Sequence, residues 1–200
     1  TALAAEFEAR YPQSQEAGLF YFNVASELEG HAPEAASPLL EKAAALGEEG
    51  LKRHIAGIQE RQKLLNSELD LQFTALDGSK VDMKDLRGKV VLIDFWATWC
   101  GPCIAELPNV KETYGKYHDK GFEIIGISFD QDEDALKEMI AEEEMPWPQY
   151  FDGKGWNNDL GRKYGINSIP EMWLVDKTGK LVNMNARDGL EEKVARLLAG

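Results

Sequence analysis

The chain has 200 residues and a formal net charge of −13 at pH 7. Hydrophobic residues make up 44% and charged residues 28%, which is ordinary for a globular protein long enough to bury a core without disulfide support. The acidic excess argues against a nucleic-acid partner, because phosphate binding requires a basic surface.

The first third of the chain shows helical patterns only. Helices are predicted over residues 2–10, 16–29, 34–46 and 49–65, with breaks at Pro and Gly. The run 7–17 resembles the joint of a tetratricopeptide-like repeat, but no second copy follows at a fixed period. We therefore expect an all-helical N-terminal region over residues 1–66, with at most one such repeat, and a second domain over residues 67–200.

Strand and helix patterns alternate after residue 66. Strands are predicted over 69–76, from Val81, and over 90–96, 121–129, 147–152, 171–176 and 180–185. Helices are predicted over 102–116, 132–144, 158–164 and 189–198. This order predicts an α/β domain with a mixed sheet flanked by helices. The near-continuous apolar run 90–96 indicates a central strand buried on both faces.

Cys100 and Cys103 are the two cysteines of the chain, and they follow the predicted central strand directly. A Cys-x-x-Cys pair at a strand-to-helix junction is typical of a redox centre rather than a structural staple. A helix beginning at Pro102 would place Cys100 at its N-terminus, where free amides and the helix dipole stabilise a thiolate. Cys100, nearer the helix end and more exposed, is the predicted nucleophile, and Cys103 is the predicted resolving thiol.

Asp94 is the lone acid in the central strand. Burial should raise its pKa, which would let the carboxylate accept the proton of Cys103 during catalysis. The alternative is a structural acid at a strand edge. The three histidines are scattered and supply no convincing ligand set with the cysteines, so we expect neither a metal nor another cofactor.

Residues 93–103 resemble the active-site strand and motif of thioredoxins almost residue for residue. Residues 164–166 followed by Ile169-Pro170 resemble the cis-proline loop of the same family. The resemblance covers about residues 69–198 and implies a thioredoxin-like fold. It also implies that Pro170 is cis and faces the cysteine pair, with the backbone of Ile169 offering hydrogen bonds to a bound substrate strand.

A substrate-binding surface is expected around the cysteine pair. Its predicted members are Trp99, Gly101, Pro102, Ile169 and Glu171. Glu171 departs from the family pattern, in which a small or hydroxylated residue commonly follows the proline. Its carboxylate is predicted to raise nearby thiol pKa values and to select basic substrates.

The opening strand pair, residues 86–92 and the long segment 131–161 resemble the TlpA/ResA-like and peroxiredoxin-like (AhpC/TSA-redoxin) branch. Many ResA-like members lack an acid at the position of Asp94. The resemblance implies a bacterial thiol:disulfide oxidoreductase with antioxidant activity, in the periplasm or elsewhere outside the cytoplasm, with a cytoplasmic location as the alternative. The chain begins at Thr1 without Met, which is compatible with a leader or membrane tether upstream.

The leading hypothesis is a reductase that passes electrons from a donor to disulfide-bearing protein clients through Cys100 and Cys103. One alternative is a peroxiredoxin-like peroxidase, which is disfavoured because no Pro lies shortly before Cys100. The other is a partner-binding module in which the N-terminal helices recruit a protein and the redox domain is secondary. The long segment 131–161, called the insert below, contains the aromatic residues Trp147, Tyr150 and Trp156. These side chains fit either a docking groove or the core, and the core is favoured.

Overall fold

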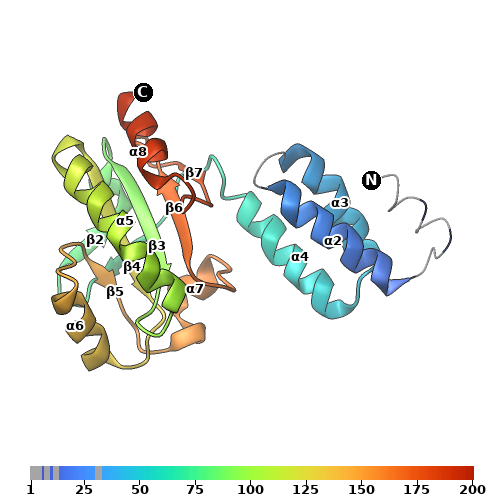
Figure 1. Cartoon of the computed structure of the whole chain (residues 1–200), viewed down its shortest axis with the longest axis horizontal. Coiled ribbons are helices and arrows are strands. Elements are labelled where there is room, and N and C mark those ends of the chain that lie inside the picture. The colour runs from blue at the N-terminus through green and yellow to red at the C-terminus, as the bar shows by residue number, and fades with distance from the viewer. Residues whose placement is uncertain (1–5, 7–9, 11–13, 30–32) are drawn as a thin grey trace. The chain divides into compact units, whose positions relative to one another are not determined.

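The computed structural model describes residues 6, 10, 14–29 and 33–200. The chain divides into two compact units, Thr1–Gln62 and Lys63–Gly200 (Figure 1). The helix predicted over 2–10 and most of the run 7–17 lie outside the described residues.

The first unit contains the helices α2 (Gln15–Glu29), α3 (Pro33–Leu46) and α4 (Glu49–Gln62). Helix α2 packs along α3, and α4 packs against α3. The shared apolar side chains form a core of their own: Tyr21, Ala25, Ala36, Leu40, Ala43, Ile55 and Ile58. Helix α4 ends at Gln62, three residues before the predicted end. The chain turns there, because Asn66 takes a left-handed backbone and its N–H donates to the carbonyl of Leu181.

The second unit is built on a five-stranded mixed sheet with the order β5-β4-β3-β6-β7. Its strands are β3 (Val90–Trp96), β4 (Phe122–Ser128), β5 (Gln149–Tyr150), β6 (Glu171–Val175) and β7 (Leu181–Asn183). Strands β3, β4 and β5 are parallel to one another, whereas β6 runs antiparallel to both β3 and β7. The separate hairpin of β1 (Gln72–Thr74) and β2 (Lys80–Asp82) is shorter than the predicted strand 69–76.

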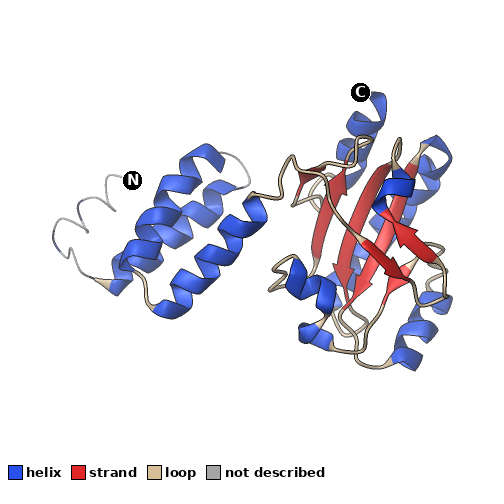
Figure 2. Ribbon diagram, turned by 180° about the vertical axis from the view of Figure 1, so that it is seen from behind, coloured by secondary structure: helices blue, strands red, loops and turns tan. Residues whose placement is uncertain are grey.

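Helices cover the sheet on both faces, as the alternation of patterns predicted. They are α5 (Gly101–Tyr117), α6 (Glu133–Glu142), α7 (Asp159–Lys163) and α8 (Leu190–Ala199), with the 3₁₀ turns η1 (Met83–Leu86), η2 (His118–Lys120) and η3 (Gly155–Asn157). Helices α5 and α8 lie side by side in Figure 1, joined by an ion pair between Lys116 and Glu191. Figure 2 shows the sheet from the opposite side.

Strand β3 is the centre of this unit, and its bounds are those predicted. All seven of its residues are buried, including Asp94, because it lies between β4 and β6 and under α8. The strand ends at Trp96, and a short turn leads to α5. The fold therefore delivers the Cys-x-x-Cys motif at the C-terminal edge of the most buried strand, next to the end of the parallel strand β4.

Candidate active site

Cys100 and Cys103 form a disulfide at the N-terminus of α5, with their Cα atoms 5.2 Å apart. Cys100 is the N-cap of this helix, and its Sγ accepts a hydrogen bond of 3.2 Å from the backbone N–H of Cys103. Pro102 occupies the first turn, which also carries no acidic residue. Once the disulfide opens, a negative charge on the Cys100 sulfur lies at the positive, N-terminal end of the α5 dipole. The arrangement therefore favours a Cys100 thiolate.

Both sulfurs are shielded in the closed disulfide. Cys100 is 5% exposed and Cys103 is 3% exposed, so Cys100 is the more exposed of the two, as predicted, by a small margin. Both cysteines belong to the buried core of this unit. The neighbouring residues Trp99, Gly101 and Pro102 are exposed, and a client must approach across them.

Asp94 is buried in β3 six residues before Cys100. Burial, with a further contribution from the negative charge of Glu106, raises the pKa of Asp94 from 3.8 to about 7. Its Oδ1 has no hydrogen-bond partner within the described part of the chain. The direction of the predicted pKa shift is therefore confirmed, and near neutral pH this carboxyl group can either hold or accept a proton.

The residue that raises the pKa of Asp94 electrostatically, Glu106, was not singled out from the sequence. It lies on α5, one turn after Cys103, and its carboxylate accepts hydrogen bonds from Arg187 and Asn109. The three-residue spacing between Cys103 and Glu106 was visible in the sequence. The proximity of Glu106 to Asp94 was not, because it depends on how α5 packs on the sheet.

The Ile169–Pro170 peptide bond is cis, as the resemblance implied. Glu171, the next residue, begins β6 and lies opposite Phe95 near the end of β3. This register brings the proline loop to the same edge of the sheet as the loop that carries Cys100. Ile169 is half-buried against the core. The Glu171 carboxylate accepts a hydrogen bond of 2.8 Å from the indole N–H of Trp173, so it is engaged on its own strand.

A second acid at this edge, Asp130, was also missed in the sequence. It is 2% exposed and follows β4. Its carboxylate accepts hydrogen bonds from the hydroxyl of Thr98 at 2.6 Å, from the backbone N–H of Thr98 and from the hydroxyl of Ser128. These bonds hold the turn that places Cys100 at the helix end. An acid directly after a buried strand parallel to β3 was the signal that could have found it.

The aromatic residues of the insert separate into core and surface. Trp147 is buried and Tyr150 is half-buried, as favoured from the sequence. Trp156, by contrast, is 49% exposed, and its ring centroid lies 6.0 Å from that of Trp99, which is 54% exposed. The preference for a core position is therefore wrong for Trp156, because the 3₁₀ turn η3 carries this side chain to the surface beside the Cys-x-x-Cys motif.

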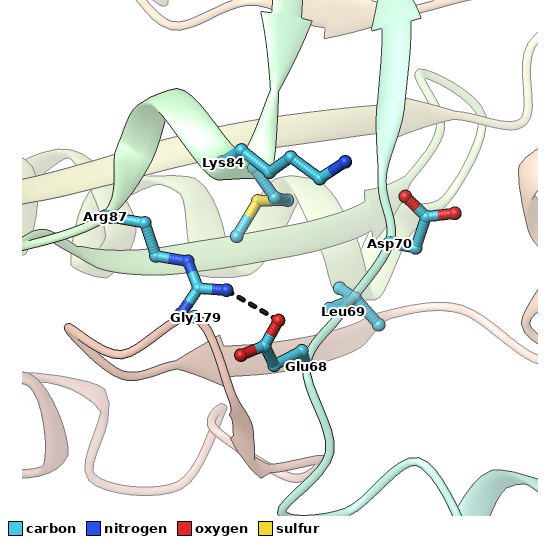
Figure 3. A pocket seen from close by; sticks show the side chains of 7 residues that line it. Glu68, Leu69, Asp70, Lys84, Arg87 and Gly179 are labelled. Carbon is cyan, nitrogen blue, oxygen red and sulfur yellow. Dashed lines mark ion pairs between the residues drawn. The ribbon is translucent and has the colours of Figure 1, made fainter.

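A shallow hollow elsewhere on this unit contains neither cysteine (Figure 3). It is lined by Glu68, Leu69, Asp70, Met83, Lys84, Arg87 and Gly179. Arg87 and Glu68 form an ion pair of 2.7 Å across it.

Among the described residues, no group of three or more His, Cys, Asp or Glu side chains could hold a metal ion. No described helix combines the length and apolar character needed to span a bilayer.

Comparison with known proteins agrees with this geometry. Residues 59–198 match the Redoxin family model. The chain is 34% identical over 125 residues to the thiol-disulfide oxidoreductase ResA of Bacillus thuringiensis subsp. konkukian, a match covering 62% of this chain and 70% of that protein. It is 32% identical over 132 residues to the thioredoxin-like protein YneN of Bacillus subtilis, covering 64% and 72%.

Solved structures show the same similarity. The thioredoxin domain of a thiol-disulfide oxidoreductase from Bacteroides vulgatus matches with a TM-score of 0.60 and 34% identity, covering 67% of this chain and 97% of that one. A thiol:disulfide interchange protein from Bacteroides sp. matches with a TM-score of 0.58 and 33% identity, covering 68% and 93%. The fold and the cysteine pair thus define a thioredoxin-fold oxidoreductase. The chain belongs to the redoxin family, and within it to the ResA-like proteins, which confirms the predicted family and fold class.

Proposed function

We propose that this protein is a thiol:disulfide oxidoreductase that reduces disulfides of protein clients by cycling Cys100 and Cys103 between dithiol and disulfide. The observation that carries the proposal is the position of the Cys100 sulfur. It caps α5, accepts the backbone N–H of Cys103, and lies within bonding distance of the second sulfur. The names of the relatives, thiol-disulfide oxidoreductase and thioredoxin-like protein, support the same reaction.

The reaction proceeds through two exchanges that balance. In the first, the Cys100 thiolate attacks one sulfur of the client disulfide, the client S–S bond breaks, and the other client sulfur leaves as a thiolate. In the second, Cys103 loses its proton and attacks the Cys100 sulfur of the mixed disulfide. The Cys100–Cys103 disulfide forms and the second client sulfur leaves, so the client gains two electrons. The client thiolates become a dithiol by taking up two protons, the one that Cys103 lost and one from the solvent. An external dithiol donor then returns two electrons to the pair.

Asp94 is the proposed acceptor of the proton from Cys103. With a pKa of about 7 the carboxyl group is partly ionised at neutral pH, and this matches the requirement for a base that can also return the proton. The exposed residues Trp99, Gly101 and Pro102 are the proposed platform for the client. On the opposite side, Pro170 and the backbone of Ile169 are proposed to align the client strand, with Glu171 beside them.

The proposed direction is reductive. Gly-Pro between the cysteines is the dipeptide of thioredoxin, whose reduction potential is about −270 mV. We further propose a periplasmic or other extracytoplasmic location with a tether upstream of Thr1, by analogy with the branch that the chain resembles. The helical region 1–66 is proposed as a separate domain from residues 67–200 and as a docking site for a protein partner. The family match begins at residue 59, so helices α2 and α3 lie outside it.

The test is reduction of insulin disulfides driven by dithiothreitol. The wild-type protein should accelerate the reaction, and Cys100→Ser should abolish the acceleration. Cys103→Ser should instead accumulate a stable mixed disulfide between Cys100 and insulin, visible by mass spectrometry of the non-reduced protein. Full turnover by Cys100→Ser would refute the mechanism. A mixed disulfide that forms in Cys100→Ser but not in Cys103→Ser would reverse the two roles.

A further inference from the structure

Two tryptophans form an exposed aromatic surface beside the cysteine pair. Among the described residues, the exposed large apolar side chains are Leu19, Leu65, Trp99 and Trp156. Trp99 and Trp156 lie next to each other, with ring planes 54° apart. The other three tryptophans of the chain are buried, at 3% exposure or less. Half-exposed indoles forgo much of the burial that normally stabilises them, so their position calls for an explanation.

Trp156 rests on a rigid base. Its ring lies 5.2 Å from that of Phe129, which is buried under it. Gly161 packs so closely on Phe129 that a Cβ there would come within 2.5 Å of the Phe129 ring. The η3 turn is held by the buried Asn158, whose backbone N–H donates to Gly155 and whose side-chain amide donates to Ser128. A side chain already held in place loses little conformational freedom on binding, which favours recognition.

The position of this pair matches the path of a client. In the mixed disulfide, the client cysteine is bonded to the Sγ of Cys100, and the Cα of Trp99 lies about 3.8 Å from that of Cys100 across one peptide bond. An extended client advances by about 3.3–3.6 Å per residue. A side chain one or two residues from the client cysteine therefore reaches the two indoles. Their faces and the Phe129 base are apolar, which suits an aromatic or aliphatic side chain.

We infer that Trp99 and Trp156 form an aromatic clip that binds an apolar side chain next to the disulfide cysteine of the client and so selects among clients. This inference rests on the proposed function and adds a specificity determinant to it. Trp99 contributes through its place beside Cys100. Trp156 contributes the second wall, from an insert that is distant in the sequence.

The experiment compares two oxidised peptides that differ at one residue beside a disulfide cysteine, Trp in one and Ala in the other. The full-length protein should reduce the Trp peptide with a kcat/KM about tenfold higher, which corresponds to about 1.4 kcal/mol. Trp156→Ala should bring this ratio close to one, and Trp156→Phe should restore most of it. Leu65→Ala, which removes an exposed apolar side chain outside the clip, should leave the ratio at its wild-type value.

The outcomes separate the two levels of the argument. If the wild-type protein reduces neither peptide, the proposed function fails. If it reduces both and Trp156→Ala keeps the wild-type ratio, the function stands and the clip is overturned. A third oxidised peptide carries Lys at the same position, and faster reduction of this peptide than of the Trp peptide would overturn the apolar occupant in favour of a cation. Circular dichroism establishes whether each variant folds. If Trp156→Ala does not fold, Trp156→Gln takes its place in the same comparison of peptides.

Discussion

The buried carboxyl group of Asp94 makes the stability of this protein depend on pH in a definite direction. Burial raises its pKa from 3.8 to about 7, so the folded chain holds this proton more tightly than the unfolded chain does. Between these two values the folded state binds more protons, and the free energy of unfolding must fall as the pH rises. The stabilisation from the protonated acid is complete below about pH 4 and lost above about pH 7.

The magnitude follows from the size of the pKa shift. A change from 3.8 to about 7 spans roughly three units at 1.36 kcal/mol each, which gives about 4 kcal/mol as an upper bound. Asp94→Asn removes the titration. The amide adds a pH-independent cost of about 1–3 kcal/mol, because a buried polar group without partners is destabilising. The informative quantity is therefore how the difference between variant and wild type changes with pH.

The assay is urea unfolding of the oxidised protein followed by tryptophan fluorescence. All five tryptophans of the chain lie after residue 63, so the signal reports on the unit that contains Asp94. In the oxidised protein the two cysteines do not titrate. The range from pH 4.5 to pH 8 covers about 2.5 units of the shift, so Asp94→Asn should gain up to about 3.4 kcal/mol relative to wild type. This equals about 1.7 M in the urea midpoint for an m-value of about 2 kcal/mol/M.

A difference between Asp94→Asn and wild type that stays constant from pH 4.5 to pH 8 would refute this reasoning. It would mean that the carboxylate ionises in the folded protein at no cost. A difference that grows in favour of wild type as the pH rises would contradict even the sign of the shift. Asp94→Ala provides a second measurement, because it removes the charge without introducing a buried amide.

Two further substitutions test the packing around the site. Thr98→Val removes the hydroxyl that donates to the buried Asp130, and the loosened turn should lower kcat/KM for insulin by about tenfold. Thr98→Ser should retain the wild-type kcat/KM, and equal rates for the two variants would argue against a role for this hydrogen bond. Gly126→Ala would place a Cβ within 1.8 Å of the Gln149 side chain. This substitution should lower the free energy of unfolding in urea by about 1–3 kcal/mol. Gly115→Ala is the control, because its Cβ would enter open space and should not destabilise the protein. Equal urea midpoints for the two variants would contradict the predicted clash with Gln149.

Much of the site was predicted because its signals are local. The strand 90–96, the start of α5 and the spacing of the cysteines depend on neighbouring residues, and periodicity and helix-end chemistry report such features directly. The raised pKa of Asp94 followed in the same way, since an acid inside a continuous apolar run is desolvated wherever that strand packs. The cis conformation of Pro170 was implied only by resemblance to a family.

Other parts of the site depend on elements that meet only in the folded chain. Asp130 reaches Thr98 because β3 and β4 are parallel neighbours that end at the same edge. Trp156 meets Trp99 because the turn η3 packs Trp156 on Phe129, the residue directly after β4. These contacts join residues far apart in the chain, and no local pattern encodes them.

The amino-acid sequence by itself determined the chemistry of the protein: two sulfurs one helical turn apart, a helix end to favour a charge on the first, and a buried acid before them. The tertiary structure decided how that chemistry is enclosed. It buried both sulfurs in the closed disulfide, engaged Glu171 on its own strand, braced the turn through Asp130, and brought a second indole to the surface. Helix ends and periodic patterns act over a few residues, whereas burial and side-chain contact depend on which distant segments pack together.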